Sequence, residues 1–199
     1  MLPLRDSTAA FSGNAERLLC FNRQLIDQAL DLLAAHATAQ TAFEQHTGPH
    51  LRHVIEHYEA LLVREAGCMV DYDRRPRERE LESNADLART RLNALKKRLT
   101  GWPDSAMEQA LSVHGQWGPS GEFNFATASS MGRELVFVAS HAIHHFALLK
   151  IRCEQHGIAT APDFGLAPST VANFQSINPE APAASSKKES ACPTLQTAN

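Results

Sequence analysis

The sequence predicts an all-α fold, a four-helix bundle with a short hairpin or irregular excursion before its last helix. Apolar residues recur at spacings of three and four over four segments, 13–36, 49–65, 80–99 and 129–155, and this period is that of an amphipathic helix. Glycine or proline follows the last three segments, as expected where helices end. The short connections between the segments favour antiparallel neighbours in a bundle.

Local signals set the ends of the second and third helices. Thr47 is a candidate N-cap for the second helix, and Pro49 lies in its first turn, where proline is tolerated. Gly67 is a candidate C-terminal glycine for the same helix. A charged loop over 71–77 precedes the third helix, which stops before the Gly-Trp-Pro of residues 101–103.

The stretch before the last helix has no helical period. Turn-forming residues are interspersed there with large apolar ones, which fits a short two-stranded hairpin over 110–126; they are Gly115, Gly118, Pro119 and Gly121 with Val113, Trp117, Phe123 and Phe125. Ser129 or Ser130 is then the candidate cap of the last helix, and Gly157 follows its end.

The 199 residues are enough for one domain. Residues 1–12 form an N-terminal segment without periodicity, and 13–173 form the helical domain. Residues 174–199 are rich in alanine, proline, serine and lysine, and we expect this tail to be disordered because it has too few apolar residues to form a core.

Composition and charge exclude several partner classes. The net charge is −3 and the pI is about 6.4, so we expect no nucleic acid and no anionic membrane surface as a partner. No apolar run approaches the roughly 20 residues of a membrane helix. The N-terminus lacks the pattern of a secretory signal, which predicts a cytoplasmic protein.

The ten histidines are unevenly distributed along the chain, and five of them indicate a metal site. His50, His53 and His57 fall within an arc of roughly 60° on the second helix. His141 and His145 are four residues apart and share a face of the last helix. An imidazole from a second helix, added to such a pair, gives a three-nitrogen face with open positions for water or substrate. The sequence therefore predicts a divalent ion, Zn, Ni, Fe or Mn.

Three interpretations of these histidines remain open. An enzyme needs an open metal position beside a polar pocket, and there His57 or Glu134 would serve as a base or as a partner that orients a ligand. Arg74 or Arg75 would receive a substrate carboxylate. A non-catalytic site would instead be closed by a fourth ligand such as His50, His57 or Glu56. In the third interpretation, the histidines are only packed or solvated.

Several segments together resemble the DinB-like family. The resemblance covers most of residues 14–170 and is carried by five pieces in order, namely Gly48-Pro49-His50-Leu51-Arg52-His53-Val54-Ile55-Glu56-His57-Tyr58, Asp71-Tyr72-Asp73-Arg74-Arg75-Pro76-Arg77, Ser130-Met131-Gly132-Arg133-Glu134-Leu135, Ser140-His141-Ala142-Ile143-His144-His145 and Phe164-Gly165-Leu166-Ala167-Pro168-Ser169-Thr170. These pieces are similar to those of an uncharacterised sub-group of this superfamily. The resemblance implies a DinB-like four-helix bundle.

The resemblance also implies the identity of the metal ligands. By motif position, His53 matches the first ligand, and His141 and His145 match the pair on the last helix. The superfamily includes thiol transferases that use small thiols such as mycothiol or bacillithiol, and an isomerase. We therefore expect a metal-dependent enzyme that activates a thiol or water for thiol transfer or hydrolysis of a small-molecule substrate. The alternative is a non-catalytic metal- or small-ligand-binding helical protein, and a homodimer is left open.

Overall fold

The computed structural model describes residues 13–39, 43–63 and 68–177. The expectations for the segment 1–12 and for most of the tail lie outside these residues. Helix α7 (Pro168–Ile177) runs four residues beyond the domain boundary expected at residue 173. The described part of the tail is therefore helical.

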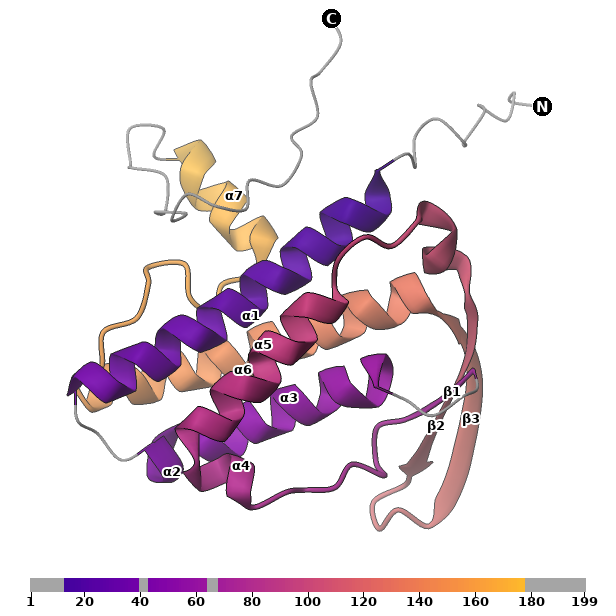
Figure 1. Cartoon of the computed structure of the whole chain (residues 1–199), viewed down its shortest axis with the longest axis horizontal. Helices are drawn as coiled ribbons and strands as arrows, with labels where there is room; N and C mark the ends of the chain where they lie inside the picture. Colours follow the sequence, from indigo (N-terminus) through magenta and orange to yellow (C-terminus); the bar gives the residue numbers. More distant parts are fainter. Residues whose placement is uncertain (1–12, 40–42, 64–67, 178–199) are drawn as a thin grey trace, which may run out of the picture.

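Four long helices form the core of the molecule (Figure 1). They are α1 (Asn14–Ala39), α3 (Gly48–Leu62), α5 (Ala85–Arg98) and α6 (Met131–Gln155). Helix α1 packs against α5 and α6, and α3 packs against the same two helices. Their apolar faces meet in one buried cluster. Within it, α3 and α6 lie side by side.

Within the described residues, three short helical elements connect the long helices. Helix α2 (Phe43–His46) precedes α3, α4 (Glu80–Ser83) precedes α5, and the 3-10 helix η2 (Asp104–Glu108) follows α5. The sequence predicted one helix over 80–99, but the chain breaks at Asn84. The side chain of Asn84 accepts a hydrogen bond from the backbone N–H of Leu87 at 3.0 Å, so Asn84 is the N-cap that begins α5.

The prediction of an all-α fold is wrong, because a three-stranded mixed sheet lies at one end of the helices (Figure 1). Strand β1 (Met69–Asp71) pairs in parallel with β2 (Ala110–Trp117), and β2 pairs antiparallel with β3 (Phe123–Ser130). The hairpin was expected, but β1 was not. With three residues, β1 has no measurable period, and its partner lies about forty residues away in sequence.

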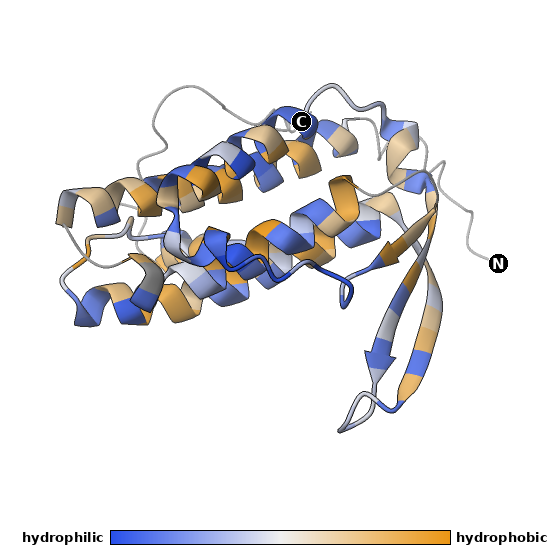
Figure 2. Ribbon diagram, turned by 60° about the horizontal axis from the view of Figure 1, so that its bottom comes forward, coloured by the Kyte–Doolittle hydropathy of each residue, from blue (hydrophilic) through white to orange (hydrophobic). Residues whose placement is uncertain are grey.

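The β2–β3 hairpin extends away from the helices (Figure 2). Alternate residues of a strand share one face, and cross-strand partners such as Trp117 and Phe123 share it as well. The rings of Trp117 and Phe125 meet edge to face, with centroids 5.7 Å apart. The hairpin therefore carries an aromatic inner face.

Helix α6 begins where β3 ends. The side chain of Ser130 accepts a hydrogen bond from the backbone N–H of Arg133 at 3.3 Å and caps the helix, as one of the two serines was expected to do. By length and composition alone, α6 is apolar enough to cross a membrane, and 39% of its most apolar window is buried inside the molecule. It is also the helix that carries the histidine pair of the predicted metal site.

A close backbone contact joins α3 to α4. A Cβ atom added at Gly48 would lie 1.8 Å from the backbone carbonyl oxygen of Glu82, well inside van der Waals contact. Glycine is therefore required where α3 begins, and this contact fixes the position of α3 and of the histidines along it.

Candidate metal centre

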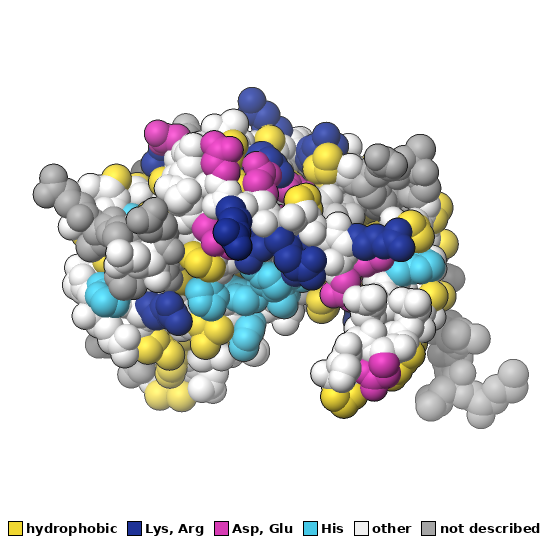
Figure 3. Space-filling model, turned by 90° about the horizontal axis from the view of Figure 1, so that it is seen from below, with side chains coloured by type: hydrophobic (Ala, Val, Ile, Leu, Met, Phe, Trp, Pro, Cys, Tyr) yellow, Lys and Arg dark blue, Asp and Glu magenta, His cyan; other side chains and the backbone are white. Residues whose placement is uncertain are grey.

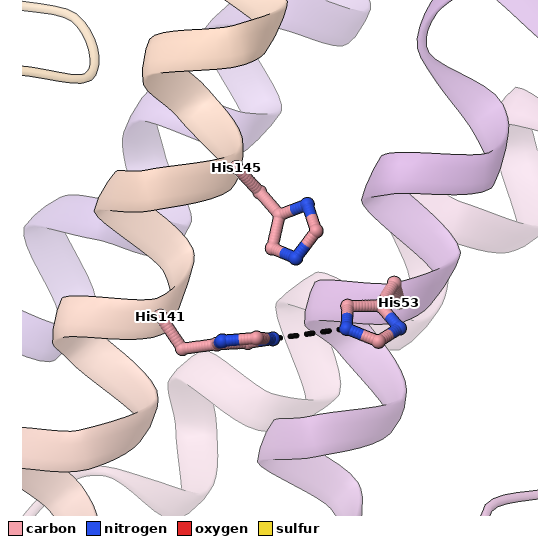
Figure 4. A group of neighbouring side chains, drawn as sticks. All are labelled: His53, His141 and His145. Atoms are coloured by element: carbon pink, nitrogen blue, oxygen red, sulfur yellow. Dashed lines mark hydrogen bonds between the residues drawn. The ribbon is translucent and has the colours of Figure 1, made fainter. Parts of the chain in front are cut away.

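Three histidines from two helices converge on one point (Figure 4). His53 comes from α3, and His141 and His145 come from successive turns of α6. One ring nitrogen from each lies within 4.8 Å of the others, and Nε2 of His53 is 2.9 Å from Nε2 of His141. These are the three residues that the sequence singled out as metal ligands.

Two more histidines extend this group. The ring centroid of His57 lies 4.2 Å from those of His53 and His141. At the other end, Nδ1 of His50 is 2.9 Å from Nδ1 of His145. The histidine side chains form a row across one face of the molecule, with arginine or lysine side chains beside it (Figure 3). We call these five residues the histidine row.

Burial keeps the rings of the histidine row neutral. Removal from water, reinforced by neighbouring histidines and Arg75, lowers the pKa of His53 to about 2 and that of His145 to about 4. Burial likewise lowers the pKa of His57 to about 3, and it lowers the pKa values of His50 and His141. Neutral imidazoles offer the lone pairs that a metal ion requires.

Arg75 lies directly against the histidine row. Its Nη1 donates to Nε2 of His57 at 3.2 Å and to the backbone carbonyl of Tyr72, and its Nη2 donates to Nδ1 of His53 at 3.3 Å. Its Nε is 3.7 Å from a carboxylate oxygen of Glu56, which is fully buried. The guanidinium of Arg75 is therefore fixed in place by these contacts and donates hydrogen bonds to two of the five histidines.

These contacts determine where the protons of two rings lie. Nδ1 of His57 lies 2.7 Å from the backbone carbonyl oxygen of His53 and must donate to it, so Nε2 of His57 is the acceptor that faces Arg75. In His53, Nδ1 accepts from Arg75, and the proton therefore lies on Nε2. Coordination through that nitrogen requires the proton to move to Nδ1 and Arg75 to withdraw its N–H.

The two arginines proposed to bind substrate have different positions. The side chain of Arg75 is 8% exposed and lies beside the histidine row. That of Arg74 is 83% exposed, with its Nε 3.3 Å from a carboxylate oxygen of Asp71. Only Arg75 is placed to meet a ligand near the histidines.

Glu134 is fully buried and is engaged in hydrogen bonds. Its carboxylate accepts from the hydroxyl of Tyr72 at 2.8 Å, from Oγ of Ser129 at 2.5 Å and from Nη1 of Arg133 at 2.8 Å. In the described part of the chain, these bonds connect α6 to the loop after β1 and to the end of β3. They give Glu134 a bridging position between elements.

A pocket of about 530 Å³ opens beside His57, between α6 and the hairpin. Its lining includes two guanidinium groups and four aromatic rings, which belong to Arg75, Arg133, Tyr72, Trp117, Phe125 and Phe137. The aromatic part was missed at the sequence level. The feature that could have revealed it is the pair Trp117 and Phe125 on the inner face of the hairpin, whose side chains are 57% and 43% exposed, respectively.

The donor set of the three converging histidines fits a divalent ion. Imidazole nitrogens suit Zn, Ni and Fe, and both helices hold the rings from rigid backbone. The ring of His141 is also stacked on Phe137, with centroids 5.7 Å apart. The three predicted histidines therefore meet in an arrangement that fits such an ion.

Comparisons with known proteins assign no family. No protein-family model matches the chain, and no solved structure matches it. The FK506-binding protein 5 of Rhizopus delemar is 30% identical over 107 residues, which is 54% of this chain. The match spans 28% of that protein's length, so most of that protein lies outside the aligned stretch.

Proposed function

We propose that this chain is a metal-dependent enzyme of the DinB-like type, in which His53, His141 and His145 hold one divalent ion. One observation carries the proposal, namely three neutral imidazoles whose nitrogens lie within 4.8 Å of one another beside a pocket of about 530 Å³. Zn, Ni, Fe and Mn are the candidate ions. A storage site has no need of such a pocket, whereas an enzyme does.

The residues of the chain then have separate tasks. A bound divalent ion supplies Lewis acidity, which lowers the pKa of a thiol or water. His57 would accept the released proton once Arg75 has turned from it to an anionic group of the substrate, because its Nε2 carries the lone pair that Arg75 then vacates. Arg75 holds an anionic group near the histidines. The reaction class is thiol transfer to an electrophile, or hydrolysis.

A second candidate function is a non-catalytic metal- or small-ligand-binding protein. The specific observation in its favour is the proximity of His50 and His57 to the three converging histidines. Either ring could serve as a fourth nitrogen ligand and leave no position for substrate.

Metal analysis distinguishes these possibilities. Protein purified without a histidine tag should carry one equivalent of metal, and His141→Ala and His145→Ala should lose it. His144→Ala is the matched control, because His144 is exposed on the same helix and should keep the metal. Absence of metal in the wild-type protein, even after loading with Zn, Ni, Mn or Fe(II), overturns the proposal.

A second measurement tests for an open metal position. The cobalt-substituted protein should change its visible spectrum when a small thiol is added, because the thiol enters the coordination sphere. A spectrum that does not respond to thiols or to substrate analogues indicates a saturated ion. That result favours the non-catalytic function.

A further inference from the structure

The pocket beside His57 has the size and shape of a small-molecule site. Its volume of about 530 Å³ lies within the range of roughly 300–1,000 Å³ typical of ligand pockets. Its inner end is formed by His57 and Arg75, and its outer wall is formed by the hairpin. A ligand that fills it would extend from the histidine row to the aromatic face of the hairpin.

Two pairs of aromatic rings line opposite sides of this pocket. Tyr72 and Phe137 lie on the helical side with ring centroids 5.1 Å apart. Trp117 and Phe125 lie on the hairpin side. The hairpin rings are extensively exposed, which is uncommon for large apolar side chains in a cavity wall unless a ligand covers them. A flat apolar group matches both sides.

The charged groups of the pocket favour an anion. Its two carboxylates are used within the protein, since Asp73 accepts from the backbone N–H of Gln116 at 2.8 Å and Glu134 accepts from three donors. The guanidinium of Arg133 lies over the ring of Phe137 at 5.4 Å. The guanidinium of Arg75 faces the histidine end, and the Nη2 N–H that is not donated to His53 can donate a charge-assisted hydrogen bond to a carboxylate.

We propose that this pocket binds a small aromatic carboxylate, with its carboxylate on Arg75 and its ring between the two aromatic pairs. The proposal rests on the proposed function, for which this molecule would be the substrate or a part of it. Carboxylate is preferred to phosphate because Asp73 and Glu134 add negative charge to the same lining. The carboxylate then lies at the end of the pocket that His57 and Arg75 form.

Calorimetric titration of the full chain tests the chemistry of the ligand. The probe is phenylacetate, with benzyl alcohol, acetate and phenyl phosphate as analogues that lack the charge, lack the ring or carry more charge. Phenylacetate should bind at least about tenfold more tightly than each analogue, as one charge-assisted hydrogen-bond pair and one buried ring require. Equal binding of benzyl alcohol, or tighter binding of phenyl phosphate, overturns the proposal.

Matched variants test the location. Arg75→Gln and Trp117→Ala should each weaken phenylacetate binding by about tenfold or more. Their controls are Arg74→Gln and Phe174→Ala, because Arg74 points to solvent and Phe174 is an exposed ring on α7 that does not line the pocket. If Arg75→Gln does not fold, Trp117→Ala still decides the matter, since that side chain is more than half exposed. Unchanged binding in Trp117→Ala overturns the proposal.

The titration is repeated on metal-free and zinc-loaded protein to separate this proposal from the proposed function. Phenylacetate binding that persists in metal-free protein supports the pocket whether or not the histidines hold an ion. Loss of metal binding with retained phenylacetate binding therefore overturns only the proposed function. Absence of phenylacetate binding in both forms overturns the pocket assignment.

Discussion

His57 shows how a single side chain combines burial with a fixed proton. It is 5% exposed, and its Nδ1–H is committed to the carbonyl of His53. The ring therefore has no room to take a second proton without losing contact with Arg75. Burial lowers the pKa of each of the other four members of the histidine row as well.

Acid should destabilise the metal-free protein because of these rings. An unfolded histidine takes up a proton near pH 6.5, whereas folding lowers the pKa of His53 to about 2, of His57 to about 3 and of His145 to about 4. Below pH 6.5, the unfolded chain binds more protons than the folded one, so the free energy of unfolding falls as pH decreases toward 4. Urea denaturation at pH 7, 6 and 5 measures it.

The variant His57→Gln should show a shallower pH dependence over the same range. The variant has one histidine fewer that takes up a proton in the unfolded state alone. The slope of the free energy of unfolding against pH therefore decreases by at most about 1.4 kcal/mol per pH unit. A free energy of unfolding that is constant between pH 7 and 5 in the wild-type protein contradicts the expectation.

Arg75 should oppose metal binding even though it lies at the centre of the site. Its guanidinium places a positive charge and an N–H donor against Nδ1 of His53, the nitrogen that must carry a proton when Nε2 coordinates. Arg75→Gln should therefore bind zinc more tightly, on the order of tenfold. Competition with a chromogenic chelator measures the affinity. The exposed Arg74→Gln variant is the control, and a weaker affinity in Arg75→Gln would contradict this assignment of protons.

At the scale of elements, the helices were accessible to sequence analysis because each carries its own period. The hairpin was also visible from its turn residues. Strand β1 was not, because its pairing with β2 joins residues such as Val70 and Val113, and no local pattern encodes a parallel partner. The break at Asn84 had a signal, an N-cap residue inside the apolar period, that the continuous period concealed.

In the candidate site, too, the residues that a local sequence pattern places were predictable, and those that tertiary contacts place were not. His53, His141 and His145 were predictable because their spacing on two helices and the family resemblance agree. The positions of Arg75 and Arg74 were not, because adjacent residues in a loop have no periodic face to assign them. The aromatic wall was missed as well, since it depends on how the hairpin sits over α6, which is a tertiary contact.

The start of α3 should not tolerate a side chain. Gly48→Ala places a methyl group where the carbonyl of Glu82 lies, so α3 and α4 must separate. We expect a loss of about 1–3 kcal/mol in the free energy of unfolding. Gly132→Ala provides the graded comparison, because its nearest contact, the carbonyl oxygen of Met107, is 3.2 Å away and the loss should be smaller. Thermal denaturation of both variants measures the difference, and equal melting temperatures contradict it.

At the scale of the whole molecule, the three converging histidines join α3 to α6 across the core. His53 and His145 lie 92 residues apart in sequence, so the unfolded chain brings them together only at a large entropic cost. An ion bound there would act as a cross-link between the two halves of the helical domain.

Zinc should therefore raise the melting temperature. A ligand present at 100 times its dissociation constant stabilises the folded state by about 2.7 kcal/mol if it does not bind the unfolded chain. The increase should be reversed by a chelator, absent in His145→Ala and retained in His144→Ala. Scanning calorimetry with and without zinc measures it, and an equal increase in His145→Ala would place the ion elsewhere.

The hydrogen bond from the backbone N–H of Gln116 to the carboxylate of Asp73 makes the hairpin and the Arg75 loop one unit. Asp73 is two residues from Arg75 in sequence, so a hairpin that lifts must either break this bond or carry the loop along with it. The amide proton of Gln116 is therefore a local reporter, and its exchange with deuterated solvent should slow when the pocket is filled. A single resonance in the hairpin would then record how firmly the arginine at the far end of the pocket is held.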